Sequence, residues 1–272
     1  QTWNYTNLKS SSSATTFNAV SSVQRAATQS LGRPWVRMAP PIGVIQNTFA
    51  DKTTDSRYDG TFVTTYRGNW DKAGVTNPVL YNANNLPVQP GGAILSFLND
   101  DSQTPTYPSG AGQNGVGAGT LPGRADWVVA PNGISRIVYP GLWKIGTYRT
   151  DDPNGLGYPN AGLTRPFNVA KFSEFYFIAA EAAVKGASGS MTARDLINVI
   201  RARAGKWKFN NAQNTTYIAD NSAAMTAATP SVITIDYILA ERSREYYGEF
   251  YRWYDLVRTQ KWGEYAASYK IG

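Results

Sequence analysis

The side chains that could carry out chemistry in this chain bear oxygen or amino groups, because the 272-residue sequence contains neither histidine nor cysteine. This composition excludes Ser-His-Asp and Cys-His catalysis, thiolate chemistry and the ordinary types of zinc site. Carboxylates, lysine and tyrosine remain for acid–base catalysis, and oxygen ligands remain for a metal such as calcium. The sequence therefore restricts any enzymatic interpretation to the chemistry of carboxylates, lysine, tyrosine and oxygen-ligated metals.

A glycosidase would need two carboxyl groups flanking the bond that it cleaves. The spacing of the aspartates singles out no pair, and acidic residues in turns usually stabilise the turns themselves. Asp151, Asp152 and Asn154 offer oxygen ligands to calcium, but the twelve-residue calcium-loop pattern is missing. Glycoside hydrolysis is the alternative function, and we expect no cofactor. The candidate carboxylates are Asp55, Asp59, Asp100, Asp101, Asp151 and Asp152.

The stretch 235–262 contains a second candidate acid–base pair, Glu241 and Glu245. Charged residues of opposite sign recur three positions apart here, which makes them neighbours on a helix surface. Glu241 with Arg244 and Asp255 with Arg258 are two such pairs. Because arginine neighbours hold a carboxylate in its ionised form, we expect structural ion pairs and no acid–base pair.

The same stretch is dense in aromatic residues at helical spacing. Tyr246, Phe250 and Trp253 fall on one stripe of a helix, and Tyr247, Tyr251 and Tyr254 fall on the next. A face of this kind predicts burial, since burying one aromatic side chain is worth about 2 kcal/mol. Gly248 predicts a break between two helices, and Asp236 and Glu249 suit the helix starts. We therefore expect these aromatic side chains to form core.

Periodicity along the chain predicts a mainly α protein with two helical hairpins, at 168–205 and 234–260. Thr192 and Asp195 have the spacing of a capping box, and Gly186 marks the end of the preceding helix. Paired helices with small residues at their crossings suggest tetratricopeptide-like units. Residues 60–165 are rich in turn formers, so we expect them to cover the hairpins as long irregular loops with a few short β-strands.

The composition is typical of a globular protein. We expect it to form a single domain over residues 1–272. Hydrophobic residues make up 42% of the chain and charged residues only 17%. The net charge of +7 raises the question of nucleic-acid binding, but the basic residues are dispersed, so we expect none. No apolar run is long enough to cross a membrane.

Several motifs resemble the SusD/RagB family. The C-terminal motif of that family is matched by the run from Glu241 to Glu245, then Gly248, and then the run from Arg252 to Leu256. Ser243 and Val257 stand where the family pattern has arginine. Further similar segments lie at 32–35, 55–66, 169–182 and 196–205, so the resemblance extends over about residues 32–262.

The resemblance implies a surface lipoprotein that binds extracellular oligosaccharide or polysaccharide without catalysis. It also implies delivery of the glycan to a SusC-like TonB-dependent transporter, on the extracellular face of the outer membrane. Family members carry their lipid anchor on an N-terminal cysteine, which this chain does not contain. We therefore expect the chain to be a fragment lacking its N-terminal portion, with 60–165 facing the ligand and 166–272 forming the helical hairpins.

Sugar recognition combines aromatic rings, which stack on the apolar faces of sugars, with polar groups that bind the hydroxyls. The loop region offers both, although each of its aromatic side chains could instead anchor a loop on the helices. We expect Trp70 to be the main sugar platform, because it follows a predicted strand and precedes an Asn/Gly/Pro-rich loop. The predicted glycan-binding residues are Trp70, Tyr81, Tyr107, Trp127, Arg67, Asn69 and Asp71.

Overall fold

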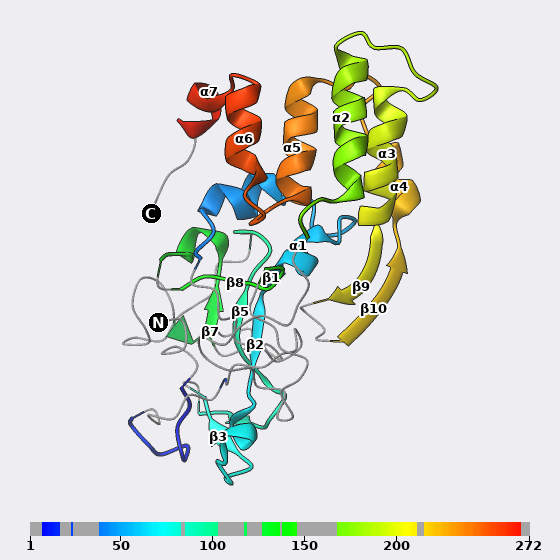
Figure 1. Ribbon diagram of the computed structural model, residues 1–272. Helices are drawn as coiled ribbons and strands as arrows, with labels where there is room; N and C mark the ends of the chain where they lie inside the picture. The colour runs from blue at the N-terminus through cyan, green and yellow to red at the C-terminus, as the bar shows by residue number, and fades with distance from the viewer. Residues whose placement is uncertain are drawn as a thin grey trace.

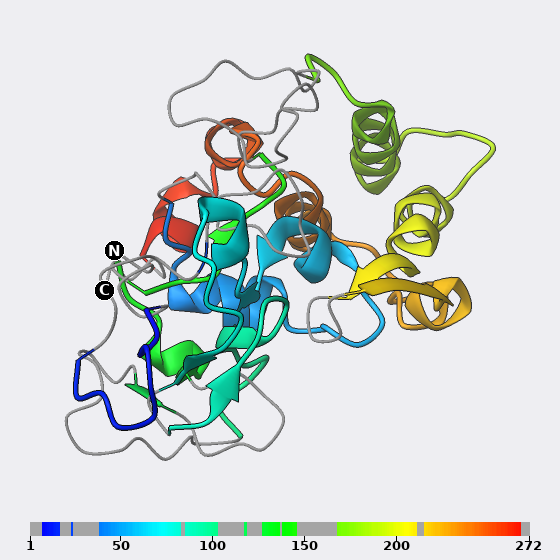
Figure 2. The same cartoon turned by 90° about the horizontal axis from the view of Figure 1, so that it is seen from below.

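The computed structural model describes residues 7–16, 23, 38–82, 85–102, 117–118, 127–136, 138–145, 168–210 and 215–267. Two regions make up this part of the chain. A row of helices runs across the top of Figure 1 in the order α7, α6, α5, α2 and α3, and a region of short strands lies beneath it. Figure 2 shows the helices of this row end on. The described fold is mainly helical, as the sequence predicts.

The first predicted hairpin is confirmed as α2 (Phe172–Val184) and α3 (Ala193–Ala204), which pack against each other. The Thr192 hydroxyl oxygen accepts a hydrogen bond from the backbone N–H of Asp195, and the Asp195 carboxylate accepts one from the backbone N–H of Thr192. This reciprocal pairing is the predicted capping box. Gly186, with a φ of +96°, lies in the turn that follows α2.

The second predicted hairpin consists of α5 (Ile235–Glu245) and α6 (Tyr251–Arg258). Gly248 lies between them with a φ of +78°, a conformation that glycine adopts without strain. The expectation that Glu249 starts the second helix is wrong. Its carboxylate instead pairs with Lys144 and Lys171, each at 2.6 Å, so it ties the hairpin turn to residues far away in sequence.

A β-hairpin and two short helices complete the helical region. β9 (Lys206–Asn210) and β10 (Thr215–Asp220) pair antiparallel where the sequence suggests only a polar connector. The short helices are α4 (Ser222–Ala227), which packs against α3, and α7 (Trp262–Ala266), which packs against α6.

The lower region is built from strands of two to five residues, and its largest sheet has the order β2-β5-β7-β6. In that sheet β5 pairs antiparallel with β2 and parallel with β7. The strands are β1 (Phe62–Val63), β2 (Thr65–Arg67), β3 (Leu80–Tyr81), β4 (Pro87–Val88), β5 (Ala93–Phe97), β6 (Gly117–Ala118), β7 (Trp127–Val129) and β8 (Gly141–Leu142). The short helical turns are η2 (Val44–Thr48), α1 (Arg57–Thr61), η3 (Trp70–Ala73) and η4 (Pro131–Gly133).

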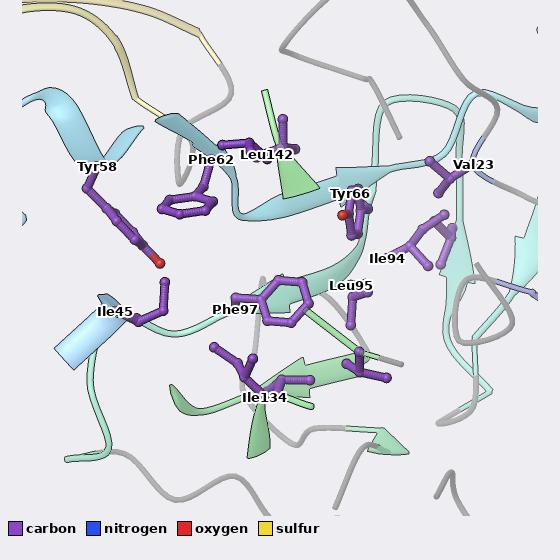
Figure 3. Packing of buried hydrophobic residues seen from close by; sticks show 14 of the residues in the cluster. Val23, Ile45, Tyr58, Phe62, Tyr66, Ile94, Leu95, Phe97, Ile134 and Leu142 are labelled. Carbon is purple, nitrogen blue, oxygen red and sulfur yellow. The ribbon is translucent and has the colours of Figure 1, made fainter. Parts of the chain in front are cut away.

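Each region has its own hydrophobic core. The strand region buries a cluster that includes Phe62, Ile94 and Leu142, each fully inaccessible to solvent (Figure 3). The helical region buries a smaller cluster around Phe177 and Ile238. The described residues between 60 and 145 therefore do more than cover the helices as loops, because they pack around a core of their own beneath the helix row.

Glu241 of α5 joins the two regions through a buried network of charges. Its side chain is 0% exposed and binds Arg57 of α1 at 2.9 Å, Arg244 of α5 at 2.7 Å and Arg201 of α3. Arg57 in turn binds Asp55 through Nε at 2.8 Å. The predicted structural ion pairing of Glu241 with Arg244 is confirmed, and two further arginines converge on the same carboxylate.

A second series of linked ion pairs connects α5, α6 and α2. Arg242 binds Asp255 at 2.7 Å, Asp255 accepts from Arg258 at 3.0 Å, and Arg258 reaches Glu181 of α2 at 2.6 Å. Asp255 is only 1% exposed, so its two arginine partners compensate a charge that would otherwise be costly to bury. Asp255 of α6 therefore faces inward.

The aromatic face of 246–254 is only partly core, which corrects the prediction. Tyr246 is buried, but Phe250, Trp253 and Tyr254 are exposed by 80%, 63% and 63%. Because Asp255 and Leu256 face the neighbouring helices, residues on the opposite side of α6 must face outward. On α2, likewise, Phe177 and Ala180 are buried whereas Phe172 and Phe175 are exposed.

We expect Glu241→Gln to lower the free energy of unfolding by about 3–5 kcal/mol at neutral pH, because it leaves three guanidinium groups around an uncharged amide. Burial raises the pKa of Glu241, but Arg57, Arg244 and Arg201 outweigh it and hold the pKa below the usual 4.5. A carboxylate with a lowered folded-state pKa contributes stability above its ordinary pKa and loses it as the pH falls. Urea unfolding at about pH 7, 5 and 3 measures both effects, and the variant should lose less stability than the parent on acidification.

Glu264→Gln is the matched control, because Glu264 also pairs with a cation, Lys261, but its side chain is 59% exposed. Its loss should stay within about 1 kcal/mol. Equal losses in the two variants would contradict a structural role for the buried charge.

Candidate functional site

Trp70, the main predicted sugar platform, is part of the strand-region core. The side chain is 0% exposed, and its indole N–H donates to the backbone carbonyl of Asn77 at 2.9 Å. Gly68 packs directly against the ring, so a Cβ at that position would overlap it. The prediction that Trp70 presents a face to sugar is therefore wrong, because neither face of the indole reaches solvent.

The polar residues next to Trp70 do not form a site with it. Asn69 is buried, at 2% exposed, whereas Asp71 is exposed on η3. Arg67 ends β2 half-buried and donates to the carbonyl of Gly91 at 3.3 Å. A glycan-binding role for Arg67 and Asp71 stays a prediction, whereas Asn69 is closed off by burial.

The other predicted aromatic residues are not brought together by the described structure. Tyr81 is half-buried in the β3–β4 pair, where its backbone also pairs with Lys9. Trp127 begins β7 in the four-stranded sheet, where its backbone pairs with Leu95. Tyr107 lies outside the described residues. Sugar binding by these three aromatic residues remains a prediction.

Carboxylates offer no support for an acid–base pair in the described residues. Asp55 is held by Arg57, and Asp100 accepts hydrogen bonds from Ser102. Asp101 accepts from the Gln46 side chain, and Asp59 is buried. Asp151 and Asp152, including the suggested calcium cluster, lie outside the described residues. Within the described ranges no group of three acidic side chains is arranged to hold a metal ion.

The structure places a different set of polar residues around one hollow of about 1010 Å³ between the helix row and the strand region. A volume of this order is typical of small-molecule sites. Segments far apart in sequence meet there. They are the residues that precede and form η2, the loop after η4, and one side each of α5, α6 and α7. The lining residues are 39–44, 46–48, 132, 134–136, 240, 243–244, 252 and 265.

One wall of the hollow carries arginines that are held in place by other groups. Arg244 donates to Glu241 at 2.7 Å and to the carbonyl of Thr48 at 3.3 Å. Arg252 donates to the carbonyl of Leu239 at 3.2 Å, and its guanidinium lies 4.8 Å from the centroid of the Tyr265 ring. These contacts fix the directions of both guanidinium groups, which reduces the entropy lost when a ligand binds.

The lining of the hollow also includes amide and hydroxyl groups. Gln46 donates to Asn132 at 3.2 Å, and the neighbouring Asn47 is exposed. Tyr265 supplies an aromatic ring whose hydroxyl donates to Asp236 at 3.2 Å; burial and this carboxylate raise the pKa of Tyr265. A ring, amides, hydroxyls and guanidinium groups around one hollow can together stack on and hydrogen-bond a polar ligand rich in hydroxyl groups.

Sequence reasoning did not identify this site, because its residues come from four separate segments. Its one local signal is the pair Pro40 and Pro41, which excludes a helix before residue 42, so a helical turn that carries Gln46 and Asn47 can begin only after them. No spacing rule connects these residues with Arg136 or Tyr265, so the hollow is a product of the tertiary fold.

A profile of the SusD family matches residues 130–271, which is more than half of the chain. The chain belongs to the SusD family. No curated protein matches the sequence. Membership in this family associates the chain with glycan binding at the outer-membrane surface.

The residues that carry the resemblance to the SusD family have a structural role here. Glu241, Arg242, Arg244 and Glu245 all take part in ion pairs, so the structural ion pairing predicted for Glu241 and Glu245 is confirmed. Of the same motif, Ser243, Arg244 and Arg252 also line the hollow. In the described part of the chain, no helix has the length and apolar character needed to cross a membrane.

We expect Trp70→Ala to lower the free energy of unfolding by about 3–5 kcal/mol, because it leaves a cavity in a fully buried site. Trp253→Ala makes the same change at a side chain that is 63% exposed and touches Trp262, with ring centroids 4.0 Å apart. It should cost about 1 kcal/mol or less. Urea unfolding of both variants tests this, and equal losses would contradict the assignment of Trp70 to the core and Trp253 to the surface.

Proposed function

We propose that this SusD-family chain binds extracellular oligosaccharide or polysaccharide in the hollow between η2, the loop after η4 and helices α5 to α7, without hydrolysing it. The observation that carries the proposal is the make-up of the hollow, which combines the Tyr265 ring with amide, hydroxyl and guanidinium groups. Such groups satisfy sugar hydroxyls and stack on the apolar face of a pyranose ring. Family membership supports the same class of ligand.

The kind of side chain around the hollow supports the proposal that binding occurs without catalysis. Both ordinary glycosidase mechanisms place two carboxyl groups about 5–10 Å apart across the glycosidic bond. The described residues that line the hollow include neither aspartate nor glutamate. Among the described lining residues, a bound sugar would therefore meet hydrogen-bonding groups but no pair of carboxyl groups.

We expect Asn47→Ala and Tyr265→Ala each to weaken glycan binding about fivefold to twentyfold, which corresponds to about 1–2 kcal/mol. Asn47 is exposed and has no described hydrogen bond, so its loss should leave the fold intact. Calorimetric titration against a panel of neutral and acidic oligosaccharides measures the affinity, and a parallel reducing-sugar assay measures hydrolysis.

Tyr254→Ala is the matched control for Tyr265→Ala, because Tyr254 is an exposed tyrosine on α6 outside the hollow. It should bind as the parent does. Retained affinity in both hollow variants would contradict the site, and release of reducing sugar by the parent would support the glycosidase alternative.

On the basis of family membership we further propose that the protein acts on the extracellular face of the outer membrane and delivers its glycan to a SusC-like TonB-dependent transporter. Native protein purified in mild detergent should bring such a transporter with it in about equimolar amount. A control purification at high ionic strength tests whether the association depends on surface charge. Recovery of the native protein without any transporter, under both conditions, would count against this partner.

A further inference from the structure

The hollow has a strong charge asymmetry that the general function does not explain. Three of its lining residues are arginines, and none of its described lining residues is acidic. Neutral sugars need donors and acceptors in comparable numbers, which amides and hydroxyls supply. Guanidinium groups only donate, and they match the geometry of a carboxylate or sulfate in a bidentate manner.

Arg136 is the arginine best placed to meet a ligand. It lies just after η4 and is exposed, and in the described part of the chain it takes part in no ion pair or hydrogen bond. Arg244 and Arg252 are half-buried on the facing helices, and their directions are fixed by Glu241 and by the Tyr265 ring. An exposed arginine without a described ion pair therefore lines the same hollow as two arginines that are held by other groups.

The carboxylates nearest the hollow are engaged by other groups. Glu241 is buried among three arginines, and Asp101 accepts from Gln46 and from the backbone N–H of Asn132 at 2.9 Å. Asp236 accepts from the Tyr265 hydroxyl and pairs with Lys261 at 3.2 Å. Each contacts a lining residue without itself lining the hollow, so a ligand meets the positive groups first.

We propose that the hollow selects acidic glycans, in which sugars carry a carboxylate, as in uronic acids, or a sulfate ester. This inference rests on the proposed function and names the ligand class of the same site. An anionic group of the sugar would bind the guanidinium of Arg136 and those of Arg244 and Arg252, while its hydroxyls would bind Asn47 and Ser135. Charge-assisted hydrogen bonds of this kind are about twice as strong as neutral ones.

The general charge of the chain is the competing explanation for any preference for acidic glycans. A net charge of +7 attracts polyanions wherever they bind. A second basic residue far from the hollow separates the two explanations. Lys208 of β9 is exposed, and β9 lies at the opposite end of the helix row from α6 and α7 (Figure 1). Lys208→Gln removes the same charge as Arg136→Gln, so it is the matched control.

The test uses a short oligogalacturonate, its fully methyl-esterified form and a sulfated galactan oligosaccharide, titrated calorimetrically into the parent, Arg136→Gln and Lys208→Gln. The ester keeps the sugar chain and removes the charge. We expect the parent to bind the acid at least about tenfold more tightly than the ester, Arg136→Gln to lose about tenfold on the acid only, and Lys208→Gln to stay within about twofold. Melting temperatures check that both variants are folded.

Each outcome is decisive. If the parent binds both anionic oligosaccharides more tightly than the ester, selection by charge is supported. If it prefers only one of them, that ligand identifies the anionic group, carboxylate or sulfate, that the hollow recognises. Equal affinity for acid and ester, with binding still sensitive to Asn47→Ala, overturns the acidic class but leaves the proposed function standing. Equal losses in Arg136→Gln and Lys208→Gln overturn the assignment to the hollow. Failure to bind any glycan of the wider panel overturns both proposals together.

Discussion

The buried carboxylate of Glu241 is the interaction on which the arrangement of this molecule depends. A single ionised side chain with no solvent exposure receives guanidinium groups from α1, α3 and its own helix. Taking such charges out of water costs several kcal/mol per ion, and only close pairing offsets that cost. The three partners must therefore keep their positions, which fixes the helix row relative to the start of the strand region. The ion pairs of Glu241 therefore contribute more to the relative position of the two regions than to the net free energy of folding.

The position of the hollow is a consequence of that geometry. Arg244 binds Glu241 with one end of its guanidinium and the carbonyl of Thr48 in η2 with the other, and it also lines the hollow. Arg252, on the next helix, is held by a carbonyl of α5. Arg244, one of the groups that we propose for ligand recognition, is thus an outward end of the network that joins the two regions. A change at Glu241 should accordingly disturb the hollow as well as the fold.

The sequence was most informative where structure is local. The capping residues Thr192 and Asp195, the turn at Gly248 and the pairing of Glu241 with Arg244 depend on neighbours within four positions, and all are found. The short strands were only partly predictable. Two-residue strands such as β1 and β8 are too short to show a periodic sequence pattern, and they pair across about eighty residues. Trp70 was misplaced for the same reason, since Ile94 and the Asn77 carbonyl bury it through contacts that loop composition does not reveal.

Helix α6 shows why aromatic density alone misleads about the core. Its inner face carries Asp255 and Leu256, and the aspartate is required there because Arg242 and Arg258 bind it from two sides. With that face occupied by ion pairs, the geometry of the helix turns Trp253 and Tyr254 outward. The helix row is therefore held in part by buried charge. Its cohesion should weaken on acidification more than that of helices packed only through aromatic side chains, because protonating Glu241, whose pKa its arginine partners lower, leaves those arginines without compensation.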